Sequence, residues 1–246
     1  MIADPFVQLR LLELQAVDTA LSQLQHRRRT LPELARIAEC DKRAGDVRSR
    51  LVEAQTALAD LASEQRRLES DVDTVRLRAD KDQQRMTTGG LPAKELTGLQ
   101  HEVTSLARRQ AVLEDELLEL METRETAEQQ VTELDLALAA VQAERATAEA
   151  SRDEVFGELD DAEAKHLTGR TELTAKLPAD LLALYDKIRE SSGGVGAAAL
   201  HQRRCEGCRI ELAGSELGVV RAAKPDQVLR CENCRRILVR THESGL

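Results

Sequence analysis

The chain has 246 residues, of which 32% are charged and 41% hydrophobic, and its formal net charge is −9. Only three side chains are aromatic, Phe6, Phe156 and Tyr185. Because large aromatic residues dominate thick cores, their scarcity argues against one compact globule. There is no run of about 18 apolar residues and no basic start followed by an apolar stretch, so we expect a cytoplasmic protein without a membrane span or secretory signal.

The N-terminal segment is expected to form a helix, with Asp4 as its N-cap and Pro5 at its first position. Its apolar residues recur at helical spacing: Leu14, Val17, Leu21 and Leu24. Pro32 removes a backbone donor and clashes with the preceding turn, which predicts a kink near residue 32. The first helix then either continues in the same arm or folds into a short third strand of the bundle.

Two long heptad seams follow the kink. The first runs from Ile37 to Met86 and the second from Leu96 to Leu173, with more polar interruptions in its later part. Two glycines and a proline mark a turn at about residues 87–92, where they act as helix-stop signals. Sustained heptads joined by a short turn predict a mainly α protein, with a long antiparallel coiled-coil hairpin over residues 1–176.

The register of this hairpin is predicted by pairing residues whose numbers add up to 178, which places Ile37 opposite Val141. Gln65 and Gln110 fall in adjacent layers of this pairing. We predict that their amides meet and help to fix the register, as single buried polar residues do in coiled coils.

Residues 177–194 are expected to form a short helix followed by a flexible linker, and residues 195–246 a separate module. Two CxxC pairs, Cys205 with Cys208 and Cys231 with Cys234, are separated by 22 residues. Four thiolates at this spacing suit a tetrahedral structural zinc, and β-rich runs flank the pairs, so a small β zinc ribbon is predicted. Redox-active dithiols and an iron–sulfur centre are the competing interpretations, but the βαβ setting of redox pairs is absent.

Other residues near the metal motif are assigned simpler roles. Gly207 and Asn233 are expected to adopt the left-handed backbone of the knuckle turns. His201 and His242 are expected to be surface residues, since four cysteines already fill the metal's coordination. Cys40, on the first seam opposite Leu138, is expected to be a small buried side chain rather than a reactive thiol.

Basic residues make the ribbon a candidate contact surface. Residues 197–246 hold nine Lys/Arg and six Asp/Glu, so they carry +3 while the rest of the chain carries −12. Zinc with four thiolates adds −2, so several arginines have a local charge to balance. The candidate contacts for nucleic acid or a protein are Arg203, Arg204, Arg209, Arg230, Arg235, Arg236 and Arg240 on the ribbon and Lys81, Arg85 and Lys94 at the hairpin tip.

The chain resembles the bacterial family of coiled-coil proteins with a C-terminal C4-type zinc ribbon. The resemblance is carried by the two knuckles with their flanking arginines, by Leu91 to Leu96 at the predicted tip, and by Leu99 to Glu102 just after it. It implies nucleic acid and protein as partner classes, because members are described as candidate nucleic-acid-binding proteins and some flagellar regulators contact an mRNA and the nitrogen-type sigma factor. Relatives usually have Gly directly after the last cysteine, where this chain has Arg235.

These observations predict a non-enzymatic zinc-ribbon adaptor that presents a ribbon and a hairpin tip to protein or RNA/DNA partners. The first alternative is a gene regulator that binds RNA or DNA through the ribbon, and the second is a purely structural coiled-coil spacer. The sequence contains no phosphate loop, no nucleophile–base constellation and no paired carboxylates on a defined pocket. We therefore expect neither enzymatic activity nor a small-molecule substrate.

Overall fold

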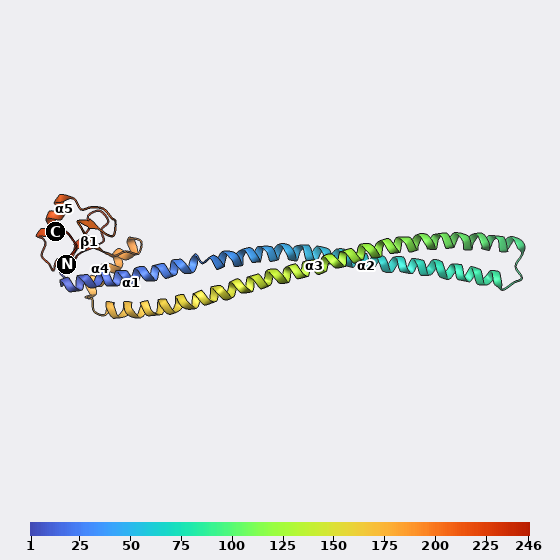
Figure 1. Ribbon diagram of the computed structural model, residues 1–246, viewed down its shortest axis with the longest axis horizontal. Helices are drawn as coiled ribbons and strands as arrows, with labels where there is room; N and C mark the ends of the chain where they lie inside the picture. The colour runs from blue at the N-terminus through green and yellow to red at the C-terminus, as the bar shows by residue number, and fades with distance from the viewer. The chain divides into compact units, whose positions relative to one another are not determined.

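The structure is a computed structural model that describes residues 1–246. The chain forms five helices and four strands, and Figure 1 shows its course from the N-terminus to the C-terminus. The helices are α1 (Pro5–Arg29), α2 (Pro32–Thr87), α3 (Ala93–Thr174), α4 (Ala179–Ser191) and α5 (Gly214–Ala222). The strands are β1 (Ala197–His201), β2 (Arg204–Cys205), β3 (Leu229–Arg230) and β4 (Ile237–Arg240). No helix is both long enough and apolar enough to cross a membrane.

The chain forms two compact units, and their limits differ from the domain boundaries expected from the sequence. One unit is Ala35–Glu149, and the other combines Met1–Leu34 with Ala150–Leu246. The first helix and the end of α3 therefore belong with the ribbon. Both chain termini also lie in this second unit (Figure 1).

The first helix begins and ends where its sequence signals predict. The Asp4 carboxylate accepts a hydrogen bond from the amide of Phe6 at 2.8 Å, and the helix ends at Arg29, just before Pro32. Before that break, α1 lies beside the end of α3, where Arg28 pairs with Asp160.

The unit Ala35–Glu149 is the coiled-coil hairpin of α2 and α3. Near the turn, Arg78 pairs with Glu102, within two positions of the predicted register. Farther from the turn, Val141 packs against Cys40 and Ala44 instead of Ile37. The pairing there is displaced from the predicted register by about one heptad. After a shift of one heptad the same seam positions still face the partner helix, so the heptad pattern alone does not distinguish the two registers.

The predicted contact between the two glutamine amides is wrong. The Oε1 atom of Gln65 accepts a hydrogen bond from Arg124 Nη1 at 2.8 Å, while Gln110 donates to Glu114 within its own helix. The polar layer therefore pairs a glutamine with an arginine. Cys40 is buried in the cluster that includes Leu138, consistent with its expected packing role.

The second unit contains a four-stranded sheet in the order β2-β1-β4-β3, in which β1 and β4 run parallel and the other neighbours are antiparallel. Helices α1 and α4 contribute to a core with this sheet, in which Leu11 and Leu14 meet Tyr185, Ile237 and Val239. A second core holds the metal motif together with α5, a helix that the sequence analysis missed. The sheet therefore shares one hydrophobic core with α1 and α4 and a second one with the metal motif and α5.

Candidate metal centre and basic surface

Four cysteine side chains meet at the end of the chain. All the Sγ atoms of Cys205, Cys208, Cys231 and Cys234 lie within 4.8 Å of one another. The Cys205–Cys234 and Cys208–Cys231 Sγ distances are 3.8 and 3.9 Å. Zinc at about 2.3 Å from each sulfur of a tetrahedron requires sulfur–sulfur distances of about 3.8 Å. The cysteines fit a structural zinc site, as the sequence predicted.

The backbone of the knuckles differs from the prediction. The left-handed residues are Arg209 and Arg235, with φ of 60° and 62°, each directly after the second cysteine of its pair. Neither Gly207 nor Asn233 has a positive φ. Gly207 is required by space instead, since a Cβ there would lie 2.8 Å from Arg236 Cδ and 3.0 Å from Ala198 Cβ.

Two charged side chains hold the knuckles in place. Arg236 donates to the carbonyls of Val195 and Gly207 at 3.1 and 2.9 Å, and to that of Ser192 at 2.7 Å. The buried carboxylate of Glu216, on α5, accepts from the amide of Glu232 in the second knuckle at 3.0 Å. Sequence reasoning missed Glu216, because its helix carries no signal that links it to the cysteines.

The thiol pKa values follow from the surroundings of each sulfur. Burial raises the pKa of Cys205 and of Cys231 above the usual range. Burial also acts to raise the pKa of Cys234, but hydrogen bonds, chiefly from the backbone amide of Arg236, outweigh it and leave that pKa lowered. Burial therefore opposes the thiolate form that a bound metal requires at two of the four sulfurs.

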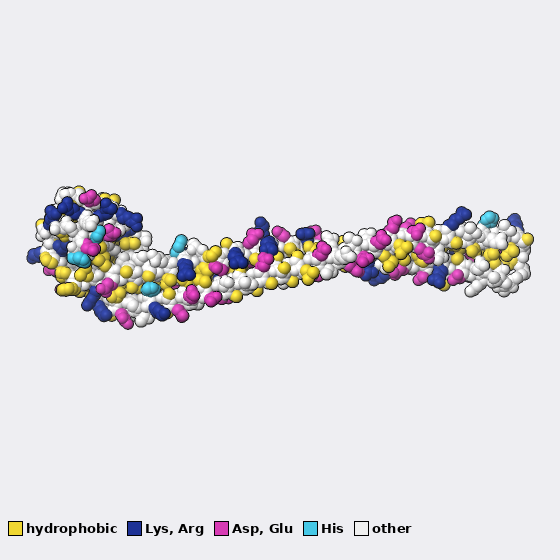
Figure 2. Space-filling view, viewed as in Figure 1, with side chains coloured by type: hydrophobic (Ala, Val, Ile, Leu, Met, Phe, Trp, Pro, Cys, Tyr) yellow, Lys and Arg dark blue, Asp and Glu magenta, His cyan; other side chains and the backbone are white.

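The predicted arginines of the ribbon differ in how many hydrogen bonds their side chains make. Arg240 donates to main-chain carbonyls, including those of Ala223 and Pro225, and Arg236 is similarly occupied. Two others each donate to one carbonyl, Arg203 to Gly245 and Arg230 to Arg235. Among the predicted ribbon arginines, three are exposed and have guanidinium groups that make no hydrogen bond or ion pair: Arg204, Arg209 and Arg235. Figure 2 shows lysine and arginine side chains gathered over the ribbon.

The remaining predicted positions lie away from the metal. His242 is 91% exposed, and His201 lies 3.9 Å from Glu206, so neither belongs to the four-cysteine cluster. At the hairpin tip, Lys81 and Lys94 are exposed. Arg85 is instead paired with Glu95 at 3.3 Å, which leaves the two lysines as the freer cations of the tip.

A buried polar network joins the ribbon to the helices. Gln15 Oε1 accepts from the amide of Gly196 at 2.7 Å and from the hydroxyl of Tyr185 at 3.1 Å. Asp18, 1% exposed, accepts from Tyr185 at 2.7 Å and from Arg170 at 2.8 Å.

This network also fixes the segment expected to be a flexible linker. The carbonyl of Gly194 accepts a hydrogen bond from Gln15 Nε2 at 3.1 Å, so the linker is tethered to α1. The sequence signal for the network was available, because Gln15 and Asp18 interrupt the apolar face of the first helix.

Comparisons with known proteins agree with this architecture. A family model described as a CT398-like coiled coil hairpin domain matches residues 14–193, and one described as a C4-type zinc ribbon domain matches residues 204–238. An uncharacterized protein of Mycobacterium tuberculosis is 41% identical over 233 residues, covering 95% of each chain. One of Mycobacterium leprae is 31% identical, covering 87% of this chain and 92% of its own.

Solved structures show the same fold. A protein of Mycobacterium smegmatis aligns with a TM-score of 0.89 at 38% identity, covering 98% of this chain and 100% of that one. CT398 of Chlamydia trachomatis aligns with a TM-score of 0.71 at 20% identity, covering 96% and 98%, a likeness of fold alone. The matched modules are a coiled coil and a zinc ribbon, neither of which is a known enzyme family. The chain belongs to the family of CT398-like coiled-coil hairpin proteins that carry a C4-type zinc ribbon.

Proposed function

We propose that this protein is a non-enzymatic adaptor that holds a partner on its zinc ribbon. The proposal rests on one observation: some arginines of the ribbon donate hydrogen bonds to main-chain carbonyls, whereas others are exposed and make none. Four thiolates complete the coordination of the zinc and leave no position for water or substrate. Arg236 and Arg240 support the fold, whereas Arg204, Arg209 and Arg235 are exposed and free to contact a ligand.

The free arginines favour a nucleic acid as one partner of this adaptor. Guanidinium groups bind phosphates through paired hydrogen bonds, and each phosphate contact makes affinity dependent on salt. No aromatic side chain lies in the ribbon, since the only aromatic residues are Phe6, Phe156 and Tyr185. Contacts to the phosphate backbone, rather than stacking on bases, are therefore the proposed mode of binding.

The hairpin tip is the second proposed contact surface, and it suits a protein partner. Lys81 and Lys94 are exposed near the turn, and both turn glycines have positive φ. A tip with few internal contacts is free to adapt to a partner, as loops on rigid scaffolds commonly do.

The test is a titration of the zinc-loaded chain with RNA and DNA between about 50 and 200 mM salt. We expect affinity to fall steeply with salt and to be lost when Arg204, Arg209 and Arg235 are all changed to Ala. A matched control changes Arg67, Arg108 and Arg109 on the hairpin to Ala, which should leave binding within about twofold. Absence of binding at the lowest salt would remove nucleic acid as a partner and leave the protein adaptor to be tested at the ribbon and tip.

A further inference from the structure

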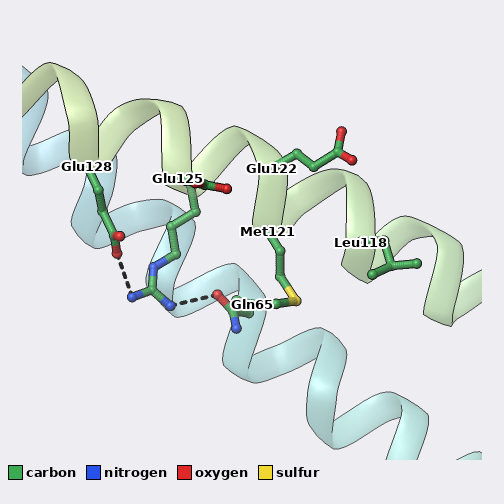
Figure 3. A pocket seen from close by; sticks show the side chains of 7 residues that line it. Gln65, Leu118, Met121, Glu122, Glu125 and Glu128 are labelled. Atoms are coloured by element: carbon green, nitrogen blue, oxygen red, sulfur yellow. Dashed lines mark hydrogen bonds and ion pairs between the residues drawn. The ribbon is translucent and has the colours of Figure 1, made fainter.

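Two surface clusters outside the zinc centre contain side chains of the types that bind metals. The first is a recess of about 380 Å³ on the hairpin, where Glu122, Glu125 and Glu128 of α3 supply carboxylates. Figure 3 shows Glu128 paired with the guanidinium group of Arg124, at 2.7 Å. Because this guanidinium already provides the positive charge, and because the recess contains no imidazole, the first cluster does not favour a transition-metal ion.

The second cluster lies on the ribbon and combines two imidazoles with two carboxylates. His201 is the last residue of β1, Glu206 belongs to the first knuckle, and His242 and Glu243 lie in the turn after β4. The Nε2 atom of His201 lies 3.8 Å from Oε2 of Glu243, and Nε2 of His242 lies 3.8 Å from Oε1 of the same carboxylate. Neither carboxylate pairs with a lysine or an arginine, so both remain available to a metal ion.

Main-chain hydrogen bonds hold these side chains next to one another. The amide of Gln202 donates to the carbonyl of Glu243 at 2.8 Å, and the next amide along the chain donates to that of Ser244 at 2.9 Å. The Ser244 hydroxyl is buried and donates to the carbonyl of Leu200 at 3.0 Å. The turn after β4 is therefore fixed against the end of β1, and only side chains need to reorient around a bound ion.

The backbone next to His201 is strained. Gln202 and Arg203 have φ of 45° and 64°, a left-handed conformation that residues other than glycine rarely adopt. Such strain is often found at ligand sites, where the surrounding structure maintains it. This tight turn returns the chain so that Oε1 of Glu206 lies 3.9 Å from Nδ1 of His201. The two ring nitrogens of His201 thus face different carboxylates.

The chemistry of the cluster suits a divalent transition-metal ion. Imidazole nitrogen and carboxylate oxygen bind Zn²⁺ and Ni²⁺. Ligand distances of about 2.1 Å place neighbouring ligand atoms of a tetrahedron about 3.4 Å apart, so the 3.8 Å separations must close by about 0.4 Å. His242 is 91% exposed, so its ring is free to rotate toward an ion. A metal-binding histidine usually donates its other ring N–H to a carboxylate, which is the position of Glu206 beside His201.

We propose that His201, His242 and Glu243 bind a second divalent metal ion of the Zn²⁺ or Ni²⁺ class, and that Glu206 positions the His201 ring. Two imidazoles and one carboxylate leave at least one coordination position for water, so this ion exchanges with solution more readily than one held by four cysteines. The inference goes beyond the proposed adaptor function, because the site forms without a nucleic acid or a protein partner.

The test is a calorimetric titration of the untagged, zinc-loaded chain with NiCl₂, since elemental analysis distinguishes nickel from the zinc of the four cysteines. We expect one nickel ion per chain, with a Kd on the order of 10 µM, and unchanged zinc content. Each of His201→Gln, His242→Gln and Glu243→Gln removes a ligand and should weaken nickel binding at least about tenfold.

The positioning role of Glu206 is tested separately. Glu206→Gln should weaken nickel binding about tenfold, because the His201 ring loses its charged acceptor. In the metal-free, zinc-ribbon state, ¹⁵N NMR should show a weaker preference for the proton on Nδ1 of His201, a change that a merely structural role would not produce. Unchanged affinity in this variant would contradict the positioning role.

A matched control is His101→Gln, which removes an exposed histidine that also precedes a glutamate, but on α3. This control should bind nickel within about twofold of wild type, as expected for a surface change away from the site.

Three outcomes would overturn the proposal: a wild-type chain that binds no nickel at about 100 µM, a His242 or Glu243 variant that binds as tightly as wild type, or a control as defective as those variants. Each variant must keep one zinc ion per chain. Should His201→Gln lose zinc because it disturbs β1, His242→Gln decides the question, since His242 is exposed and lies outside the strands.

Discussion

At the scale of single residues, the knuckle arginines carry a conformational cost. Arg235 adopts φ of 62° directly after the last cysteine, at the position where the family usually has glycine. A left-handed backbone costs a non-glycine residue about 1–2 kcal/mol, and the structure holds Arg235 there because its amide donates to the carbonyl of Cys231 at 2.9 Å.

Replacing Arg235 with Gly should therefore stabilise the zinc-loaded ribbon by about 1 kcal/mol, because glycine adopts this φ without strain. Urea unfolding of the zinc-loaded chain measures the change. Asn233→Gly is the matched control, since Asn233 does not have a positive φ and gains nothing from glycine. Lower stability of the Arg235 variant would show that the arginine side chain contributes more than its backbone costs.

At the scale of elements, the junction between α1, α4 and the ribbon depends on a buried hydroxyl. Burial raises the pKa of Tyr185, and its hydrogen bond to Asp18 raises it further. The folded chain therefore keeps the phenolic proton at a pH where the unfolded chain releases it, near pH 10. The stability that Tyr185 contributes is present below about pH 10 and decreases as the pH rises beyond it.

Tyr185→Phe should lower the free energy of unfolding by about 1 kcal/mol at neutral pH, because Asp18 loses a buried hydrogen bond. Above about pH 10 the difference from wild type should shrink, since only the wild type loses stability through this proton. Urea unfolding followed by circular dichroism across this range measures both effects. A difference that stays constant with pH would contradict the assignment of the hydrogen bond.

Some features of the elements and their contacts can be predicted from sequence patterns, and others cannot. The proline break, the turn and the four cysteines were predictable because each is a local signal with its own physical cause. The heptad displacement at Val141 and the pairing of Gln65 with Arg124 were not, since all heptad-shifted registers place equivalent residues at the interface. Gln15 is visible in the sequence as a polar residue on an apolar face, but its partner Gly196 is not, because the two lie 181 residues apart. The contact of Glu216 with the second knuckle has no local sequence signal either.

At the scale of the whole molecule, zinc supports more than the ribbon. The core that contains Leu11 and Leu14 of α1 also contains Ile237 and Val239 of β4. Because metal binding supplies the folding energy of such small modules, its loss should remove the sheet on which α1 packs. The effect of zinc should therefore extend beyond the module at residues 195–246 and reach α1.

Chelation, or Cys231→Ser, should abolish amide protection in the ribbon and weaken it in α1 and α4. Residues 35–149 should keep their protection, because they form a separate unit with clusters of their own. Hydrogen exchange read by mass spectrometry, with and without zinc, measures each region. Unchanged protection of α1 would show that its packing on the ribbon contributes little, and unchanged protection everywhere would refute the structural role of zinc.

The packing of α1 on the ribbon affects how the protein folds while it is being synthesised. The ribosome synthesises α1 long before β4. The apolar face of α1 around Leu11 and Leu14 therefore stays exposed to solvent until nearly the whole chain has been made. The main-chain hydrogen bonds of Met1 with Val228 and of Ala3 with Asp226 also form only after the C-terminal part has been made. We therefore expect the N-terminus to reach its native packing only after the ribbon has been synthesised and folded. If synthesis stops early, the apolar face of α1 stays exposed. We expect chaperones and proteases to recognise this exposed face on the incomplete chain.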